Sequence, residues 1–140
     1  MTPNLRLQLS ETLAVLRKNS SSLNIAPDPN LKTDLLSGTG STPDPFHSDD
    51  WAPIGREHAN ICAVVIKALE LVLGKRNSKV STEFAREETL QQDHSPTKRQ
   101  CWVIGIKRKG RSTVYLKGLF PTITQVVTLL SLHTSEIHNK

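Results

Sequence analysis

Hydrophobic residues near the start of the chain recur at helical spacing. Within residues 1–18 they fall at steps of four, four and three, which places one narrow apolar stripe along a helix: Leu5, Leu9, Leu13 and Leu16. Thr2 suits the N-cap of this helix, Pro3 suits its first position, and Asn19 can end it. Such a stripe must be buried, so we expect the helix to dock on its own domain or on a partner protein.

A second helix is predicted over residues 53–73, where the apolar face is wider. Its members recur at i, i+3, i+4, i+7, i+8 and i+11: Ile61, Val64, Val65, Ala68, Leu69 and Val72. Gly74 follows directly and can end the helix, because glycine adopts the left-handed backbone conformation without a steric penalty.

Period-two patterns after Gly74 predict three strands. Residues 79–84 alternate polar and apolar side chains, and two further β-prone runs, 101–106 and 113–116, flank Lys109-Gly110 as the arms of a hairpin. Residues 86–97 are polar and are expected to form a loop.

The loop length of the predicted hairpin decides its register. A loop of two or four residues pairs Val103 with Leu116, and it puts Trp102 and Tyr115 on one face. A three-residue loop would slip this pairing by one residue and is expected to spoil both faces.

The last patterned segment, from Phe120, is expected to be a helix. Thr122 and Gln125 have the spacing of a capping box, and the apolar residues that follow share one helical face: Ile123, Val126, Val127 and Leu130. The many β-branched residues leave a strand as the alternative. Residues 51–140 are therefore predicted to be an α+β domain, a three-stranded antiparallel sheet packed on two helices in the order α-β-β-β-α.

Residues 19–50 have the composition of a flexible, acidic linker. They are rich in Ser, Pro and Gly, and five aspartates stand against a single Lys32: Asp28, Asp34, Asp44, Asp49 and Asp50. Few apolar groups are present to offset the entropy of ordering the chain, so we expect disorder between the N-terminal helix (1–18) and the domain (51–140).

Composition narrows the class of protein. With 18 Lys and Arg against 13 Asp and Glu, the chain carries a formal charge of +5, and its two cysteines form no CxxC pair. A disulfide framework and a zinc finger are therefore excluded. No apolar run has the roughly 18 residues of a membrane span, and the start of the chain lacks the pattern of a signal peptide, so an intracellular protein of the cytoplasm or nucleus is expected.

The positive charge is concentrated in the second half of the chain. Residues 71–140 hold 12 basic and 5 acidic residues, whereas residues 1–70 hold 6 and 8. Lysine and arginine around a hairpin tip can contact phosphates, and two flat rings beside them can stack on bases. The candidate nucleic-acid-binding residues are Lys98, Arg99, Lys107, Arg108, Lys109, Arg111, Lys117, Trp102, Tyr115, Lys75, Arg76 and Lys79. The alternative is a solvated hairpin tip with Trp102 and Tyr115 in the core.

Catalytic, cofactor and metal sites are not expected. His58 and Cys62 are four residues apart on the predicted helix, but one pair does not make a metal site. Glu87 and Glu88 are adjacent and should point apart, and Cys101 has two basic neighbours that could lower its pKa.

The sequence favours a small non-enzymatic nucleic-acid-binding protein, with RNA preferred as the partner, of the accessory kind that many viruses encode. The alternative is a protein-interaction or self-association module that docks through the N-terminal leucine stripe or the central helix.

Overall fold

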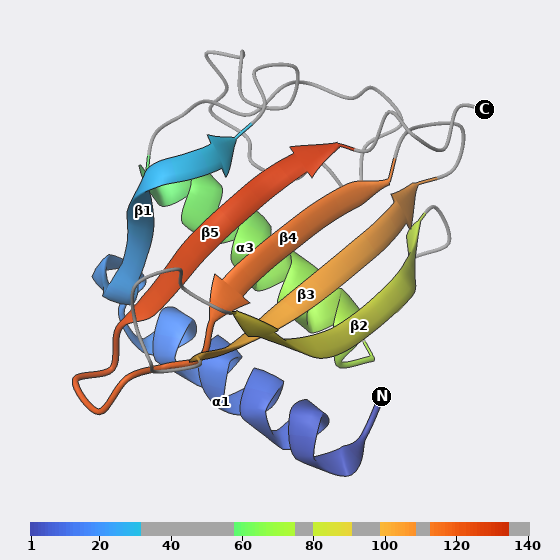
Figure 1. Ribbon diagram of the computed structural model, residues 1–140, viewed down its shortest axis with the longest axis horizontal. Helices are drawn as coiled ribbons and strands as arrows, with labels where there is room; N and C mark the ends of the chain where they lie inside the picture. The colour runs from blue at the N-terminus through green and yellow to red at the C-terminus, as the bar shows by residue number, and fades with distance from the viewer. Residues whose placement is uncertain (32–57, 75–79, 91–98, 109–112, 135–140) are drawn as a thin grey trace.

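The computed structural model describes residues 1–31, 58–74, 80–90, 99–108 and 113–134. In this part of the chain two α-helices lie on one face of a five-stranded mixed sheet, and no described helix lies on the other face (Figure 1). Neither described helix is long and apolar enough to cross a membrane.

The first helix, α1 (Pro3–Lys18), forms as its sequence predicts. The Thr2 side chain accepts a hydrogen bond from the Leu5 amide at 3.1 Å, Pro3 occupies the first turn, and Asn19 is the C-cap. The four leucines of its stripe are at most 5% exposed and belong to the main hydrophobic core. The helix therefore docks on its own domain.

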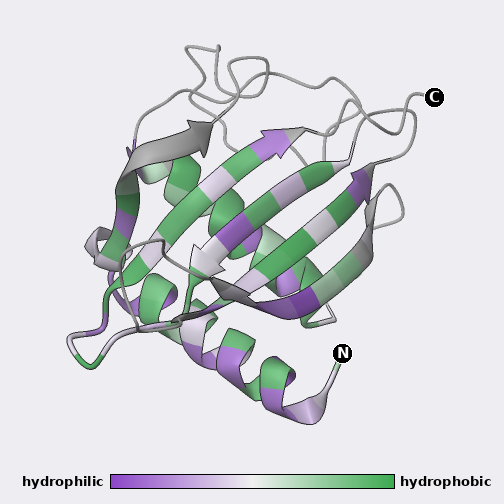
Figure 2. Cartoon of the chain, in the orientation of Figure 1, coloured by the Kyte–Doolittle hydropathy of each residue, from purple (hydrophilic) through white to green (hydrophobic). Residues whose placement is uncertain are grey.

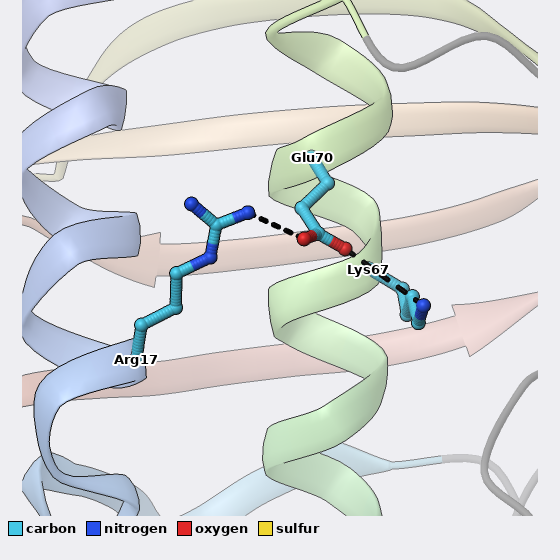
Figure 3. A network of polar contacts seen from close by, with 3 residues as sticks. All are labelled: Arg17, Lys67 and Glu70. Carbon is cyan, nitrogen blue, oxygen red and sulfur yellow. Dashed lines mark hydrogen bonds and ion pairs between the residues drawn. The ribbon is translucent and has the colours of Figure 1, made fainter.

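The second helix, α3 (His58–Val72), is also confirmed, and residues 53–57 lie outside the described residues. Its predicted apolar face is buried, and Gly74, two residues past its end, has a positive φ of 119°. Polar contacts join the two helices, because Arg17 pairs with Glu70, which Lys67 also approaches at 3.9 Å (Figure 3). The Arg6 side chain donates to the Leu73 carbonyl at 2.9 Å.

The sheet corrects the predicted fold class. It has five strands, in the order β1-β5-β4-β3-β2, where three antiparallel strands were expected. β1 runs parallel to β5, and the other neighbours are antiparallel. The strands are β1 (Leu23–Leu31), β2 (Val80–Leu90), β3 (Arg99–Arg108), β4 (Val114–Leu119) and β5 (Val127–Thr134).

Strand β1 falls within the segment that composition assigned to a disordered linker. A 3-10 turn at Ser20–Ser22 leads into it, and Leu23 then pairs with Val127. The partner strand lies near the other end of the chain, so no local pattern could reveal this pairing. Residues 32–50 of the predicted linker lie outside the described residues.

The segment after Phe120 forms a turn and a strand, so the predicted final helix is wrong. Gln125 adopts a left-handed backbone with φ of 63°, which a helix interior does not accept. Thr122 closes a turn instead of capping a helix: its hydroxyl accepts from the Val126 amide at 3.2 Å, and its carbonyl accepts from the Gln125 amide at 2.9 Å. Of the β-branched residues that left a strand as the alternative, Val127 and Thr128 begin β5.

The β3–β4 pairing is slipped by one residue from the predicted register. Trp102 lies opposite Gly118, Ile104 opposite Leu116, and Ile106 opposite Val114. This register puts Trp102, Ile104, Ile106, Val114 and Leu116 together on the helix-covered face instead of spoiling both faces. Trp102 requires it, because a Cβ at position 118 would lie 2.3 Å from the indole ring.

The two faces of the sheet differ in composition because neighbouring residues of a strand point to opposite sides. Figure 2 shows hydrophobic and polar bands alternating along β4 and β5, whereas β3 is mostly hydrophobic. The helix-covered face holds most of the core. The opposite face carries neither of the two described helices and is called the helix-free face. The residues of β2 to β5 that share it include Phe84, Arg86, Glu88, Cys101, Val103, Gly105, Lys107, Tyr115, Lys117, Ser131 and His133.

Candidate functional site

A row of rings crosses the helix-free face at right angles to the strands. Phe84 of β2 pairs with Gly105 of β3, which pairs with Tyr115 of β4, which pairs with His133 of β5. The Phe84 and Tyr115 ring centroids are 5.5 Å apart, and those of Tyr115 and His133 are 5.6 Å apart. All three rings are half-buried. We call these three residues the ring row.

Gly105 makes this row continuous. A Cβ built on Gly105 would lie 2.5 Å from the Phe84 ring, so the ring occupies the space that any other side chain would take. Phe84 thereby reaches across β3 to Tyr115, which lies two strands away. The bulge in β2 between Thr82 and Phe84 sits at the same point, and it sets which β2 residues share this face.

Cations flank the ring row on both sides. On one side Arg86 of β2 and Lys117 of β4 lie in the next register row, with Val103 between them. On the other side Lys107 lies two residues beyond Gly105 on β3 and is exposed. The Arg86 guanidinium lies over the Phe84 ring, 4.6 Å from its centroid, a cation–π geometry.

The described part of this face has more positive than negative charge. Glu88 is the carboxylate among the face residues defined above, and it lies 3.9 Å from Arg86. No ion pair joins Lys107 or Lys117 to a described carboxylate within 4 Å. By contrast, on the helix side Arg17 and Lys67 lie close to Glu70 (Figure 3).

Cys101 lies on this face as a buried thiol. Its Sγ donates to the Glu88 carbonyl at 3.4 Å, and the residue has no exposed surface. Burial raises the pKa of the thiol, and the nearby charge of Lys117 only opposes that effect. The lowered pKa expected from its basic neighbours is therefore wrong, and the thiol is a poor nucleophile at neutral pH.

Three of the predicted binding residues come together here: Lys107, Lys117 and Tyr115. Trp102 does not join them, because the slipped register puts it on the helix-covered face, fully buried, where its indole N–H donates to the Leu119 carbonyl at 3.3 Å. The core alternative for Trp102 is thus the one confirmed.

For two further predicted cations the structure gives the position along a strand. Arg99 and Arg108 are the first and last residues of β3. Six others lie outside the described residues: Lys75, Arg76, Lys79, Lys98, Lys109 and Arg111.

Sequence patterns missed three members of the site: Phe84, Arg86 and His133. Phe84 was assigned to a strand without a role and Arg86 to a loop, and His133 lies beyond the apolar residues that predicted the last helix. The spacing of Phe84 and Arg86, two residues apart, would have placed both on one face had the strand been extended past residue 85.

The two surfaces of the docking alternative, the leucine stripe of α1 and the apolar face of α3, are buried in the core of this chain.

The His58 and Cys62 pair has a structural role. His58 Nε2 lies 2.6 Å from the Leu23 carbonyl, and the Cys62 thiol donates to the Ser20 carbonyl at 3.8 Å. Both contacts fasten α3 to the chain entering β1. Within the described ranges no group of three or more His, Cys, Asp or Glu residues is arranged to hold a metal ion.

A scan against models of protein families, a search of curated proteins and a search of solved structures each gave no match.

Proposed function

We propose that this protein binds nucleic acid, with RNA favoured over DNA, through the helix-free face and without catalysing a reaction. The observation that carries the proposal is the ring row with Lys107 on one side and Lys117 and Arg86 on the other. Proteins that hold nucleic acid without base-specific chemistry combine a positive surface for phosphates with rings on which bases stack.

The charges support a polyanion as the partner. Lysine neutralises a phosphate as a point charge, and arginine can bind two phosphate oxygens at once. Three cations of the helix side are already engaged, since Arg17 and Lys67 approach Glu70 and Arg6 donates to the Leu73 carbonyl, whereas Lys18 is exposed at the end of α1. Lys107 and Lys117 also have no ion pair with a described carboxylate, and they differ from Lys18 in flanking the ring row.

A binding role also agrees with the state of the candidate catalytic groups. The Cys101 thiol has a raised pKa, which disfavours the nucleophilic thiolate. Glu87 and Glu88 point to opposite faces of β2, because they pair with Trp102 and Cys101 respectively, so they do not form an acid–base couple.

The test is charge reversal with a matched control. Lys107→Glu and Lys18→Glu change the net charge equally. Both side chains are exposed, but Lys107 lies beside the ring row, whereas Lys18 lies at the end of α1. Affinity for a fluorescently labelled RNA is measured by anisotropy over a range of salt. We expect Lys107→Glu to make the negative slope of log K against log salt shallower by about 0.7 for a single strand or 0.9 for a duplex, and Lys18→Glu to change it little.

The double variant Lys107→Glu/Lys117→Glu should weaken binding at least roughly tenfold. The proposal would be abandoned if the unmodified protein bound no RNA or DNA at low salt. Equal effects of the Lys18 and Lys107 substitutions would also contradict it, because they would show that only total charge matters.

A further inference from the structure

Resting on the proposed function, we infer that the ligand is a single strand with unpaired bases, and that the bases stack on Tyr115 and its neighbours while the phosphates lie beside the flanking cations. This inference names the class of nucleic acid, which the charge of the face alone does not decide.

The rings have a use only for unpaired bases. In a duplex each base is covered on both sides by its neighbours, and the protein meets base edges and phosphates. A protein ring can stack on a base only when the base is exposed. Tyr115 is central to such a platform, since it has Phe84 on one side and His133 on the other at nearly equal centroid distances of 5.5 Å and 5.6 Å.

The width of the sheet argues against insertion of this face into a duplex groove. Five strands at roughly 4.8 Å spacing extend across roughly 19 Å. The major groove of a DNA duplex is about 12 Å wide and admits one helix or a two-stranded ribbon, and the deep, narrow major groove of an RNA duplex admits less. A duplex could therefore touch the face only through its phosphates, and the rings would remain unused.

The cations are placed to follow a strand whose bases cover the rings. Arg86 and Lys117 occupy one register row, next to the ring row, and Ser131 continues the same row on β5. A backbone laid over this row would meet a guanidinium, an ammonium and a hydroxyl in turn. The bases of this RNA strand would reach the neighbouring ring row. Lys107, on the other side of the ring row, would contact a phosphate further along the same RNA strand.

The experiment compares one RNA in two states with the full-length protein. A non-self-complementary RNA of about 12 nucleotides, within the usual site size, is used alone and annealed to its complement. We expect tighter binding of the single strand at the same salt. Tyr115→Ala should weaken single-strand binding roughly tenfold, Tyr115→Phe should stay within about twofold because the ring is kept, and duplex binding should change little.

A second measurement does not depend on the variants folding. Tyr115 is the one tyrosine of the chain, so its ring resonances can be assigned directly after selective labelling. They should shift when the single strand is added and not with the duplex. If single strand and duplex bind equally and the Tyr115 ring responds to neither, the inference is wrong.

The two proposals fail differently. Equal binding of both RNA forms that is lost in Lys107→Glu/Lys117→Glu would overturn the single-strand inference and leave nucleic-acid binding intact. Absence of binding to either form would overturn both.

Discussion

The two faces of the sheet are built from the same strands and serve different ends. On the helix-covered face, Trp102, Ile104 and Leu116 are fully buried beneath α1 and α3. On the helix-free face the same strands present Tyr115 and Lys117, both half-buried. Substitutions on the first face should therefore cost folding stability, and substitutions on the second should cost binding.

The largest effect on stability is expected from a substitution on the helix-covered face. Trp102→Ala removes a fully buried indole and its hydrogen bond to the Leu119 carbonyl. We expect the free energy of unfolding to fall by about 3–5 kcal/mol, measured by urea denaturation. Tyr115→Ala is the control from the other face and should cost clearly less stability; an equal loss from the two variants would contradict the division between the faces.

A pair of glycine substitutions sharpens the comparison. Gly118→Ala would bring a methyl group 2.3 Å from the enclosed Trp102 ring, and Gly105→Ala would bring one 2.5 Å from the half-buried Phe84 ring. Overpacking a core typically costs about 1–3 kcal/mol. We expect Gly118→Ala to reach the upper part of this range without a specific effect on RNA affinity.

We expect Gly105→Ala to cost less stability than Gly118→Ala and to lower the affinity for RNA more. The Phe84 ring can swing outward, which lowers the cost to stability but separates it from Tyr115 and reduces affinity for single-stranded RNA. Thermal melting and anisotropy on both variants check this. If both substitutions changed stability and RNA affinity to the same extent, the distinction between the enclosed Trp102 ring and the half-buried Phe84 ring would be contradicted.

The smallest expected effect concerns the two buried thiols. Burial raises the pKa of Cys62 and of Cys101 above the ordinary value of 9.0. A raised folded-state pKa stabilises the protein fully below the ordinary pKa, and this contribution is lost as pH rises through the raised value. Cys101→Ser should therefore show a shallower loss of stability above about pH 9 than the unmodified protein, measured by urea denaturation across that range; equal pH dependence would argue against a buried thiol.

Local periodicity predicted the elements whose evidence lies within a few residues. The stripe of α1, the wide apolar face of α3 and the β-prone runs of β3 and β4 all belong to this class. The alternation at residues 79–84 indicated only the first part of β2, since residues 86–90 were expected to be a loop and the bulge puts Thr82 and Phe84 on opposite faces. β1 and β5 could not be found in this way, because Leu23 is paired with Val127, and the benefit of that pairing is invisible in either segment alone. The β-branched residues of β5 fitted either a helix or a strand until a neighbouring strand was known.

The candidate site was predictable only where charge and position coincide. Lys107, Lys117 and Tyr115 could be chosen from the hairpin pattern. Trp102 was predicted on the wrong face because a one-residue slip in the β3–β4 pairing changes which side chains of the two strands share a face. No local pattern shows that its ring needs Gly118 opposite. His133 could not be joined to Tyr115 without the fourth antiparallel strand.

The most direct test of the central claim is a map of backbone amide resonances during titration with the single-stranded RNA. The account predicts shifts on β2, β4 and β5 around Phe84, Tyr115 and His133, with α1 and α3 unchanged. Shifts confined to the helices, or none anywhere at low salt, would contradict the claim that the helix-free face binds nucleic acid.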